Sequence, residues 1–112
     1  MNDASTPTRL RNSTGIAVTA NRTHHETSDH YDDIIVHLAP RWRVIACRDR
    51  IQWIVQRRSS KHLNKGKWLG RWYCTTRNAL IATCSSLGLL TDAAATAVLK
   101  ALPDFISEYH KK

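Results

Sequence analysis

The side chains of this sequence that could do chemistry are concentrated in one stretch, residues 41–77. Eight Arg and three Lys stand there against the single carboxylate of Asp49, so this stretch carries +10, whereas the whole chain carries +8. All four Trp residues fall in the same stretch. Arg guanidinium groups bind phosphates through two parallel hydrogen bonds, and aromatic rings stack on bases. This composition is typical of a surface that contacts nucleic acid.

The candidate nucleic-acid-binding residues share a position on three predicted strands or on the loops between them. They are Arg41, Arg43, Arg48, Arg50, Arg57, Arg58, Lys61, Lys65, Lys67, Arg71, Arg77 and Trp42. Because neighbouring strands lie about 4.8 Å apart, we expect these cations to share a small surface. Cations this close together repel one another. An anionic partner is the simplest reason for the sequence to keep them. Contact with phosphates predicts no reading of base sequence, and DNA and RNA both stay open as the partner.

The four Trp residues have different expected places. Ile51, Trp53 and Val55 alternate with more polar residues and are expected to share one face of their strand, where Trp53 is expected to be buried in the core. Trp68 and Trp72 are expected to share a sheet face across Gly70, which suits a bulge or a close approach. Trp42 begins a strand and is the best candidate for an exposed stacking platform.

Two other interpretations of the basic stretch remain open. Arg stems can cover sheet surface and lie flat on Trp faces without any anionic partner, and Arg57 and Arg58 could protect an open sheet edge. Alternatively, the protein is an adaptor or inhibitor that binds another protein, by its basic face or by adding a strand at an open edge. Steep loss of affinity with salt would favour phosphate contact over strand addition.

No pattern of residues predicts catalysis. A phosphate-binding Gly-rich loop, a nucleophile elbow, His-x-x-x-His and Cys-x-x-Cys are all absent from the sequence. Few carboxylates lie in the region expected to fold, and none form a pair placed by pattern. We therefore expect a non-enzymatic protein without a small-molecule substrate.

Metal binding and cofactor binding are not expected either. Cys47, Cys74 and Cys84 do not have the spacing of a zinc site, and their odd number suits reduced, buried thiols. Potential ligands near the N-terminus lack a predicted scaffold to hold them; they are His24, His25, Glu26, Asp29 and His30.

The elements that position the basic stretch are predicted to be strands followed by helices. Strands are expected over residues 42–47, 51–57 and 68–74, the first two forming a hairpin. Residues 34–38 suit a short extra strand or simple packing. Thr75 or Thr76 caps a helix that ends at Gly88, and Thr91 caps another that begins at Asp92. Pro103 bends that helix or begins a third.

The predicted fold is an α+β domain with a three-stranded antiparallel sheet, in the order β-β-β-α-α, with two or three C-terminal helices. Residues 34–112 form this domain. Residues 1–33 are predicted to be a disordered arm, because they have too little apolar surface to offset the entropy of ordering. No apolar run is long enough to span a membrane and no signal peptide is evident, so a cytoplasmic location is expected.

Four motifs resemble a known group of proteins. They are Trp42-Arg43-Val44, Trp53-Ile54-Val55-Gln56-Arg57-Arg58, Gly70-Arg71-Trp72-Tyr73-Cys74-Thr75-Thr76-Arg77 and Leu102-Pro103. Residues 40–106 resemble short proteins carried by rhizobia and related alphaproteobacteria, often on plasmids or integrative elements. Trp72 stands where that group more usually has a small residue, and residues 1–39 have no counterpart in it. The resemblance implies a bacterial lineage and a mobile-element context, and no activity.

Overall fold

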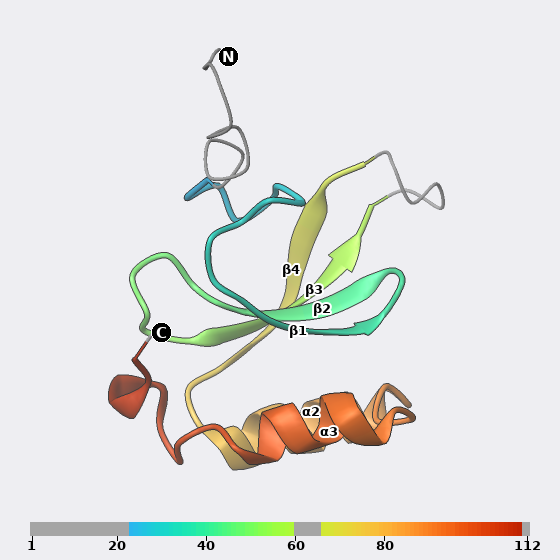
Figure 1. The fold of residues 1–112 in the computed structure, drawn as a ribbon, viewed down its shortest axis with the longest axis vertical. Coiled ribbons are helices and arrows are strands. Elements are labelled where there is room, and N and C mark those ends of the chain that lie inside the picture. The colour runs from blue at the N-terminus through green and yellow to red at the C-terminus, as the bar shows by residue number, and fades with distance from the viewer. Residues whose placement is uncertain (1–22, 60–65, 111–112) are drawn as a thin grey trace, which may run out of the picture.

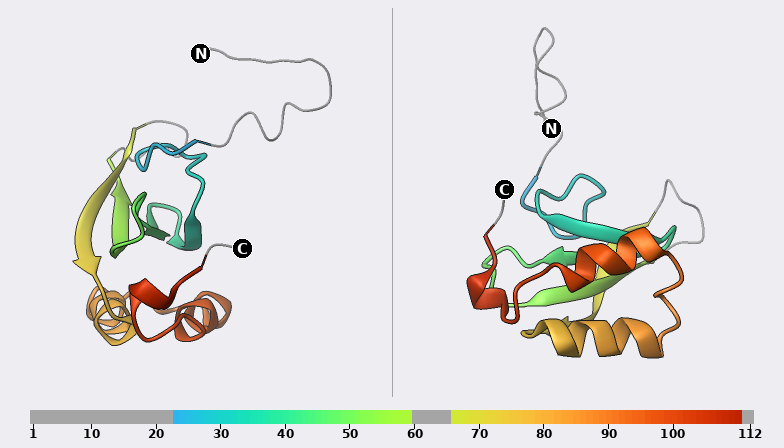
Figure 2. Two further views of the ribbon diagram at one scale, coloured as in Figure 1. Left: turned by 90° about the vertical axis from the view of Figure 1, so that its left-hand side faces the viewer. Right: turned by 60° about the horizontal axis from the view of Figure 1, so that its bottom comes forward.

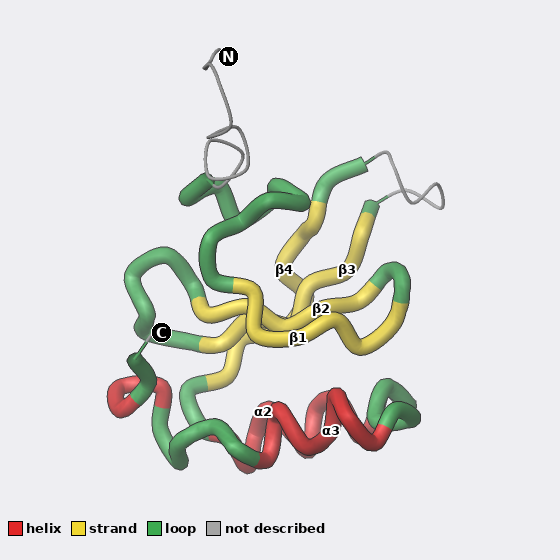
Figure 3. Tube along the Cα trace, in the orientation of Figure 1, coloured by secondary structure: helices red, strands yellow, loops and turns green. Residues whose placement is uncertain are grey.

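The computed structural model describes residues 23–59 and 66–110, and these form an α+β fold with one antiparallel sheet (Figure 1, Figure 3). The four strands are β1 (Ile34–Ala39), β2 (Trp42–Ala46), β3 (Trp53–Arg58) and β4 (Trp68–Cys74), and they lie in chain order across the sheet. The helices that follow are α2 (Arg77–Ser86), α3 (Ala93–Lys100) and the short 3₁₀ helix η1 (Ile106–Glu108). Among the described residues, no helix has the length and apolar character needed to cross a bilayer.

The expectation of three strands is wrong, because β1 is a full member of the sheet. Val36 pairs with Val44 of β2, and Ala39 pairs with Trp42 across a tight turn at Pro40. The β-branched run at the start of β1 suits a pleated surface, and the short turn brings it directly beside β2. The sheet therefore has two edges, β1 and β4.

The helix boundaries follow local capping chemistry. The Thr76 hydroxyl accepts a hydrogen bond of 3.1 Å from the Ala79 amide, which confirms the expected start of α2. Gly88 follows α2 with φ of +71°, a conformation that glycine adopts without strain. The cap of α3 is the Asp92 side chain, which accepts from the Ala95 amide at 3.2 Å, so the prediction of Thr91 is wrong by one residue.

Both helices cover one face of the sheet, which is the main core (Figure 2). Trp53 is fully buried there, as predicted, between Leu80 of α2 and the strand neighbours Val44 and Val55. Ile51, expected to share this face, instead lies exposed in the loop before β3. The apolar side of the fold is thus a two-layer arrangement of helices on a sheet.

Residues 23–33 cover the opposite face of the sheet, whereas the sequence placed them in a disordered arm. Tyr31 is buried against Ile45, Cys47 and Ile54, and its hydroxyl donates to the Ala46 carbonyl at 2.8 Å. In Figure 1 this blue and cyan segment lies on the side of the sheet away from the helices. Apolar content alone did not reveal it, because hydrogen bonds to buried side chains of the sheet hold most of the segment. Residues 1–22 lie outside the described residues.

A β-bulge in β4 changes which Trp faces where. Val55 pairs with Trp72 but the next residue, Gln56, pairs with Gly70, so Arg71 is an additional residue on β4. The additional residue reverses the alternation of side chains. Trp68 and Trp72 therefore lie on opposite faces of the sheet, and the expectation that they share one is wrong.

Gly70 is the predicted point of close approach. A Cβ atom at this position would lie 2.5 Å from the Tyr73 hydroxyl and 3.1 Å from Ile54. The absence of a side chain lets the Tyr73 ring lie over the strand beside the bulge, as glycine commonly allows in sheets.

Candidate nucleic-acid interface

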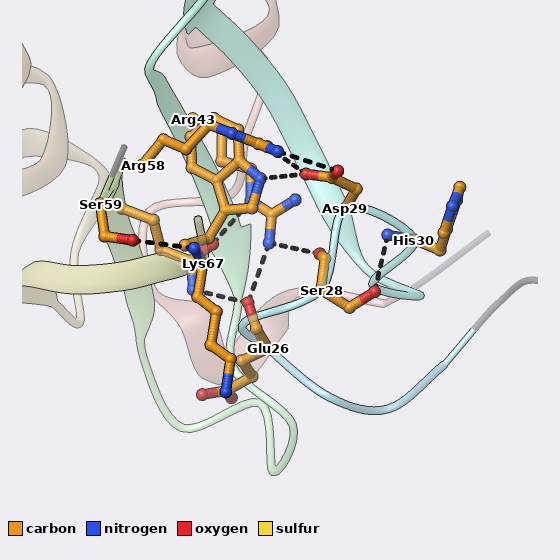
Figure 4. A network of polar contacts seen from close by, with 10 residues as sticks. Glu26, Ser28, Asp29, His30, Arg43, Arg58, Ser59 and Lys67 are labelled. Atoms are coloured by element: carbon orange, nitrogen blue, oxygen red, sulfur yellow. Dashed lines mark hydrogen bonds and ion pairs between the residues drawn. The ribbon is translucent and has the colours of Figure 1, made fainter. Parts of the chain in front are cut away.

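Arg43 is fully buried between the sheet and residues 23–33, where its guanidinium holds the covering segment in place. Nε donates to the Gln56 side-chain oxygen at 2.6 Å, and Nη2 donates to the carbonyls of Glu26 at 2.8 Å and Ser28 at 2.9 Å. The guanidinium also lies 4.4 Å from the centre of the Trp68 ring. Burial lowers the pKa of Arg43 to about 10. Figure 4 shows these contacts converging from two strands on one loop.

Arg58 is the second cation of this buried network, and it forms an ion pair with Asp29. Its side chain is 3% exposed. The same carboxylate accepts from the Trp68 indole nitrogen at 2.7 Å, and the Arg58 guanidinium lies 5.5 Å from the Trp68 ring centre. Arg43 and Arg58 are therefore engaged inside the fold and do not belong to its exposed surface (Figure 4).

The Asp29 carboxylate predicts a specific loss of stability in acid. The hydrogen bond from Arg58 holds the pKa of Asp29 below 3.8, with Trp68 contributing and partial burial opposing. A carboxyl group whose pKa is lower in the folded state than in the unfolded state stabilises the fold at pH values above the unfolded pKa. This stabilisation is lost as the pH falls through the folded pKa. Urea unfolding from pH 5 to about pH 2.5 should therefore show a steeper acid loss for the wild type than for Asp29→Asn. Equal slopes for the two proteins would contradict this assignment.

Several other predicted contact residues are also occupied by intramolecular partners. Arg77 pairs with Asp104 at 2.5 Å and donates to the Leu102 carbonyl, and so fastens the C-terminal segment to α2. Arg50 lies 3.4 Å from the carboxylate of Asp33. These intramolecular contacts account for part of the positive charge of residues 41–77 without an external anionic partner.

Trp42, Trp72 and two exposed arginines form a row on the helix-side face of the sheet, which we call the Arg–Trp row. Arg57 lies 5.6 Å from the Trp42 ring centre, Trp42 lies 6.0 Å from the Trp72 ring centre with a 31° tilt, and Arg71 lies 5.9 Å from the Trp72 ring centre. Trp72 is 37% exposed, and Trp42 is partly buried against the core. Two adjacent rings with a cation beside each can hold phosphates next to stacked bases.

The remaining cations divide between the two ends of the sheet. Trp42 pairs with Arg57 at one end, where Lys67 is also exposed. Arg48 is exposed in the hairpin loop at the opposite end, beyond the pair of Ala46 with Trp53. The expectation of one shared surface is therefore wrong, since antiparallel pairing separates residues that are close in sequence. Arg41 is half-buried, and its guanidinium donates to the Arg58 carbonyl at 3.2 Å. The predicted contacts Lys61 and Lys65 lie outside the described residues.

Sequence reasoning missed two features of this region. It assigned Trp72 to the face of Trp68, and only the bulge beside Gly70 could have indicated its true place. It also named Asp29 only as a potential metal ligand and missed its ion pair with Arg58, which lies 29 residues away and shares no local motif with it.

The three cysteines are buried and unpaired with one another. Burial raises the pKa of Cys84 to about 11 and also raises that of Cys74, whose sulfur lies 3.8 Å from the Thr83 hydroxyl. Because the thiolate is the reactive form, we expect iodoacetamide at pH 7.5 to modify these two native thiols far more slowly than the same thiols in urea. Mass spectrometry of alkylated peptides measures the difference. Rapid native labelling of Cys84 would contradict it.

Comparison with known proteins finds no match for the chain among protein-family models, curated proteins or solved structures.

Within residues 23–59 and 66–110, no group of three or more His, Cys, Asp or Glu side chains is placed to hold a metal ion. The potential ligands near the N-terminus have other contacts. The Glu26 carboxylate accepts from the Arg48 amide, and Asp29 binds Arg58.

Proposed function

We propose that this chain is a non-enzymatic protein that binds single-stranded nucleic acid through the Arg–Trp row. The observation that carries the proposal is the adjacent pair of Trp rings with an exposed Arg on each outer side. Stacking on an aromatic ring stabilises an unpaired base by about 1–3 kcal/mol. The faces of paired bases are hidden inside a duplex, so a surface that works by stacking favours unpaired bases.

The position of the row supports contact with a ligand larger than a single base. Leu69, which pairs with Arg57 across the strands, is also exposed, and Lys67 lies next to the start of β4. Arg57 and Arg71 thus lie beside the aromatic pair, and Lys67 supplies an exposed cation at the same end of the sheet, so the three can neutralise successive phosphates. The cations buried under residues 23–33 take no part in this contact.

The cheapest test is fluorescence anisotropy with labelled single-stranded DNA, RNA and duplex DNA. Three phosphate contacts on a single strand predict that affinity falls by about twentyfold between about 50 and 200 mM salt. We expect both single strands to bind more tightly than the duplex at each salt concentration. No binding of any of the three at low salt, or tighter binding of the duplex, would refute the proposal.

A matched pair of charge reversals locates the contact. Arg57→Glu should weaken single-strand binding by about tenfold and lower the salt slope by about 0.7, because one phosphate contact is lost. Arg48→Glu changes the net charge equally at the opposite end of the sheet and should change affinity by less than about twofold, since charges farther apart than a Debye length are screened. Equal effects of the two reversals would mean that binding follows net charge and not the Arg–Trp row.

The resemblance to short rhizobial proteins adds a proposed context. We place the chain, as a proposal, in a bacterial cytoplasm and among proteins of plasmids and integrative elements. That context supplies no activity, and the nucleic-acid proposal depends on the site alone.

A further inference from the structure

An open groove of about 690 Å³ lies between β1, α3 and the C-terminal segment, away from the Arg–Trp row. Its apolar surface comes from Ile34 and Ile35 of β1 and from Val98 and Leu102 at the end of α3. Val98 is 40% exposed, which is high for a β-branched residue on a packed helix. Figure 2 shows β1 and the C-terminal segment on the same side of the fold.

The β1 edge offers backbone hydrogen bonds to this groove. Among the strands of residues 23–59 and 66–110, β1 has β2 as its single neighbour, because it lies at the end of the sheet. The Ala46 amide donates to the Asp33 carbonyl at 3.1 Å, so this carbonyl points toward β2. In an antiparallel ladder the next residue then directs its own N–H and C=O away from the partner strand. Ile34 pairs with Ile45 at that position and lines the groove, so its amide and carbonyl point outward.

The charge of the groove is opposite to that of the protein as a whole. Asp32, Asp33 and Glu108 line it, while the complete chain carries +8. Asp33 is neutralised internally, since it pairs with Arg50 and accepts from the Tyr109 hydroxyl at 2.8 Å. Glu108 is exposed and has no ion pair within the part of the chain that the structure describes. Asp32 lies 3.9 Å from the His24 imidazole, so a ligand with a cationic group beside Glu108 is complementary to the groove.

We propose that this groove binds an extended segment of a partner protein, with alternating apolar and Lys or Arg side chains, as a fifth strand on β1. The segment's backbone bonds to Ile34, one side of it packs on Val98 and Leu102, and a Lys or Arg side chain lies beside Glu108. Strand addition of this kind obtains affinity from main-chain bonds and specificity from alternate side chains. Repulsion between two chains that each carry +8 opposes a second copy as the occupant, and the acidic lining disfavours nucleic acid. This proposal is independent of the Arg–Trp row.

The test begins with a displayed library of random nine-residue linear peptides selected on the full-length protein, with counter-selection on Val98→Arg. Val98→Arg blocks the groove from an exposed helix position, so the fold should tolerate it. We expect enriched peptides to alternate apolar residues with Lys or Arg, and to bind with a dissociation constant in the micromolar range when synthesised. Failure to enrich any peptide, or enrichment of acidic ones, overturns the proposal.

Binding by substituted proteins then shows whether the peptide lies in the groove. Val98→Arg should weaken binding of the synthesised peptide by about tenfold or more, and Glu108→Lys should weaken its binding less. Ala97→Arg is the matched control, because Ala97 is exposed on the same helix and does not line the groove. Equal binding by Val98→Arg and Ala97→Arg overturns the proposal. Arg57→Glu should leave peptide binding unchanged, so failure of the nucleic-acid proposal and failure of this one can be told apart.

Hydrogen exchange measured by NMR tests the strand geometry directly. Peptide binding should slow exchange of the Ile34 amide, which points outward in the free protein. Unchanged exchange at Ile34 with saturating peptide overturns strand addition. Sedimentation velocity addresses the other occupant: a dimer that Val98→Arg dissociates would show that the groove takes a second copy and would refute a partner segment.

Discussion

Replacing Arg43 by alanine should lower the free energy of unfolding by about 3–5 kcal/mol, which is as large as the cost of removing a large apolar side chain from the core. The change removes a fully buried side chain and takes the Arg43 donor from the Gln56 amide oxygen and the Ser28 carbonyl, while the Glu26 carbonyl keeps its hydrogen bond from Gln56 Nε2 at 2.9 Å. Each buried acceptor left unsatisfied costs about 1–3 kcal/mol. Relief of the desolvation that lowers the Arg43 pKa offsets part of this cost.

Urea unfolding followed by circular dichroism measures the total effect, and hydrogen exchange shows where it falls. We expect faster exchange first at the amides of Tyr31 and Asp32, because Arg43 holds the covering segment on the sheet. Arg57→Ala is the control, since it removes an exposed Arg from the same sheet and should change stability by about 0.5 kcal/mol or less. An effect of Arg43→Ala no larger than that of the control would show that the buried network does not stabilise the fold.

A double-mutant cycle separates the Arg43–Gln56 interaction from the rest. The two side chains are 2.6 Å apart and both are buried, so their effects should not add. Gln56→Ala should cost less in the Arg43→Ala background than in the wild type by about 1 kcal/mol or more. Additive effects would mean that Arg43 acts through residues 23–33 alone.

Replacing Trp72 by alanine should weaken binding of single-stranded DNA by about fivefold to 150-fold, which corresponds to the loss of one base-stacking interaction. This expectation rests on the proposed function. Trp72 is the more exposed ring of the Arg–Trp row, and Arg71 lies against it. Its removal therefore takes away a stacking surface and leaves the number of exposed cations unchanged.

Tyr73→Ala is the matched control for Trp72→Ala. Tyr73 is the next residue on β4, is 58% exposed, and lies on the other face of the sheet. Its removal should change affinity by less than about twofold, whereas Trp72→Phe should retain most of the binding because a ring remains to stack. Anisotropy titrations at a single salt concentration measure all three variants. Equal losses for Trp72→Ala and Tyr73→Ala would remove the Arg–Trp row as the contact surface.

Local sequence patterns predicted much of the element order. Alternating β-formers gave three of the four strands, Thr76 marked the start of α2, and Gly88 marked its end. Burial of Trp53 followed from its period-two neighbours. These features depend on residues within about one turn or one strand of each other, so the sequence contains all the information that they need.

Only the tertiary structure decided which cations face the solvent. Residues 41–77 form a uniform basic stretch in the sequence, yet Arg43 and Arg58 are buried while Arg57 and Arg71 are exposed. A buried Arg requires partners, and here they come from Glu26, Ser28 and Asp29, which lie far away along the chain and carry no motif. One additional residue in β4 likewise moved Trp72 to the face of Trp42. Composition determined that this protein is basic and aromatic over one stretch. Contacts between residues far apart in the sequence decided which of those side chains form a surface, because burial of a charge depends on partners that adjacent residues cannot supply.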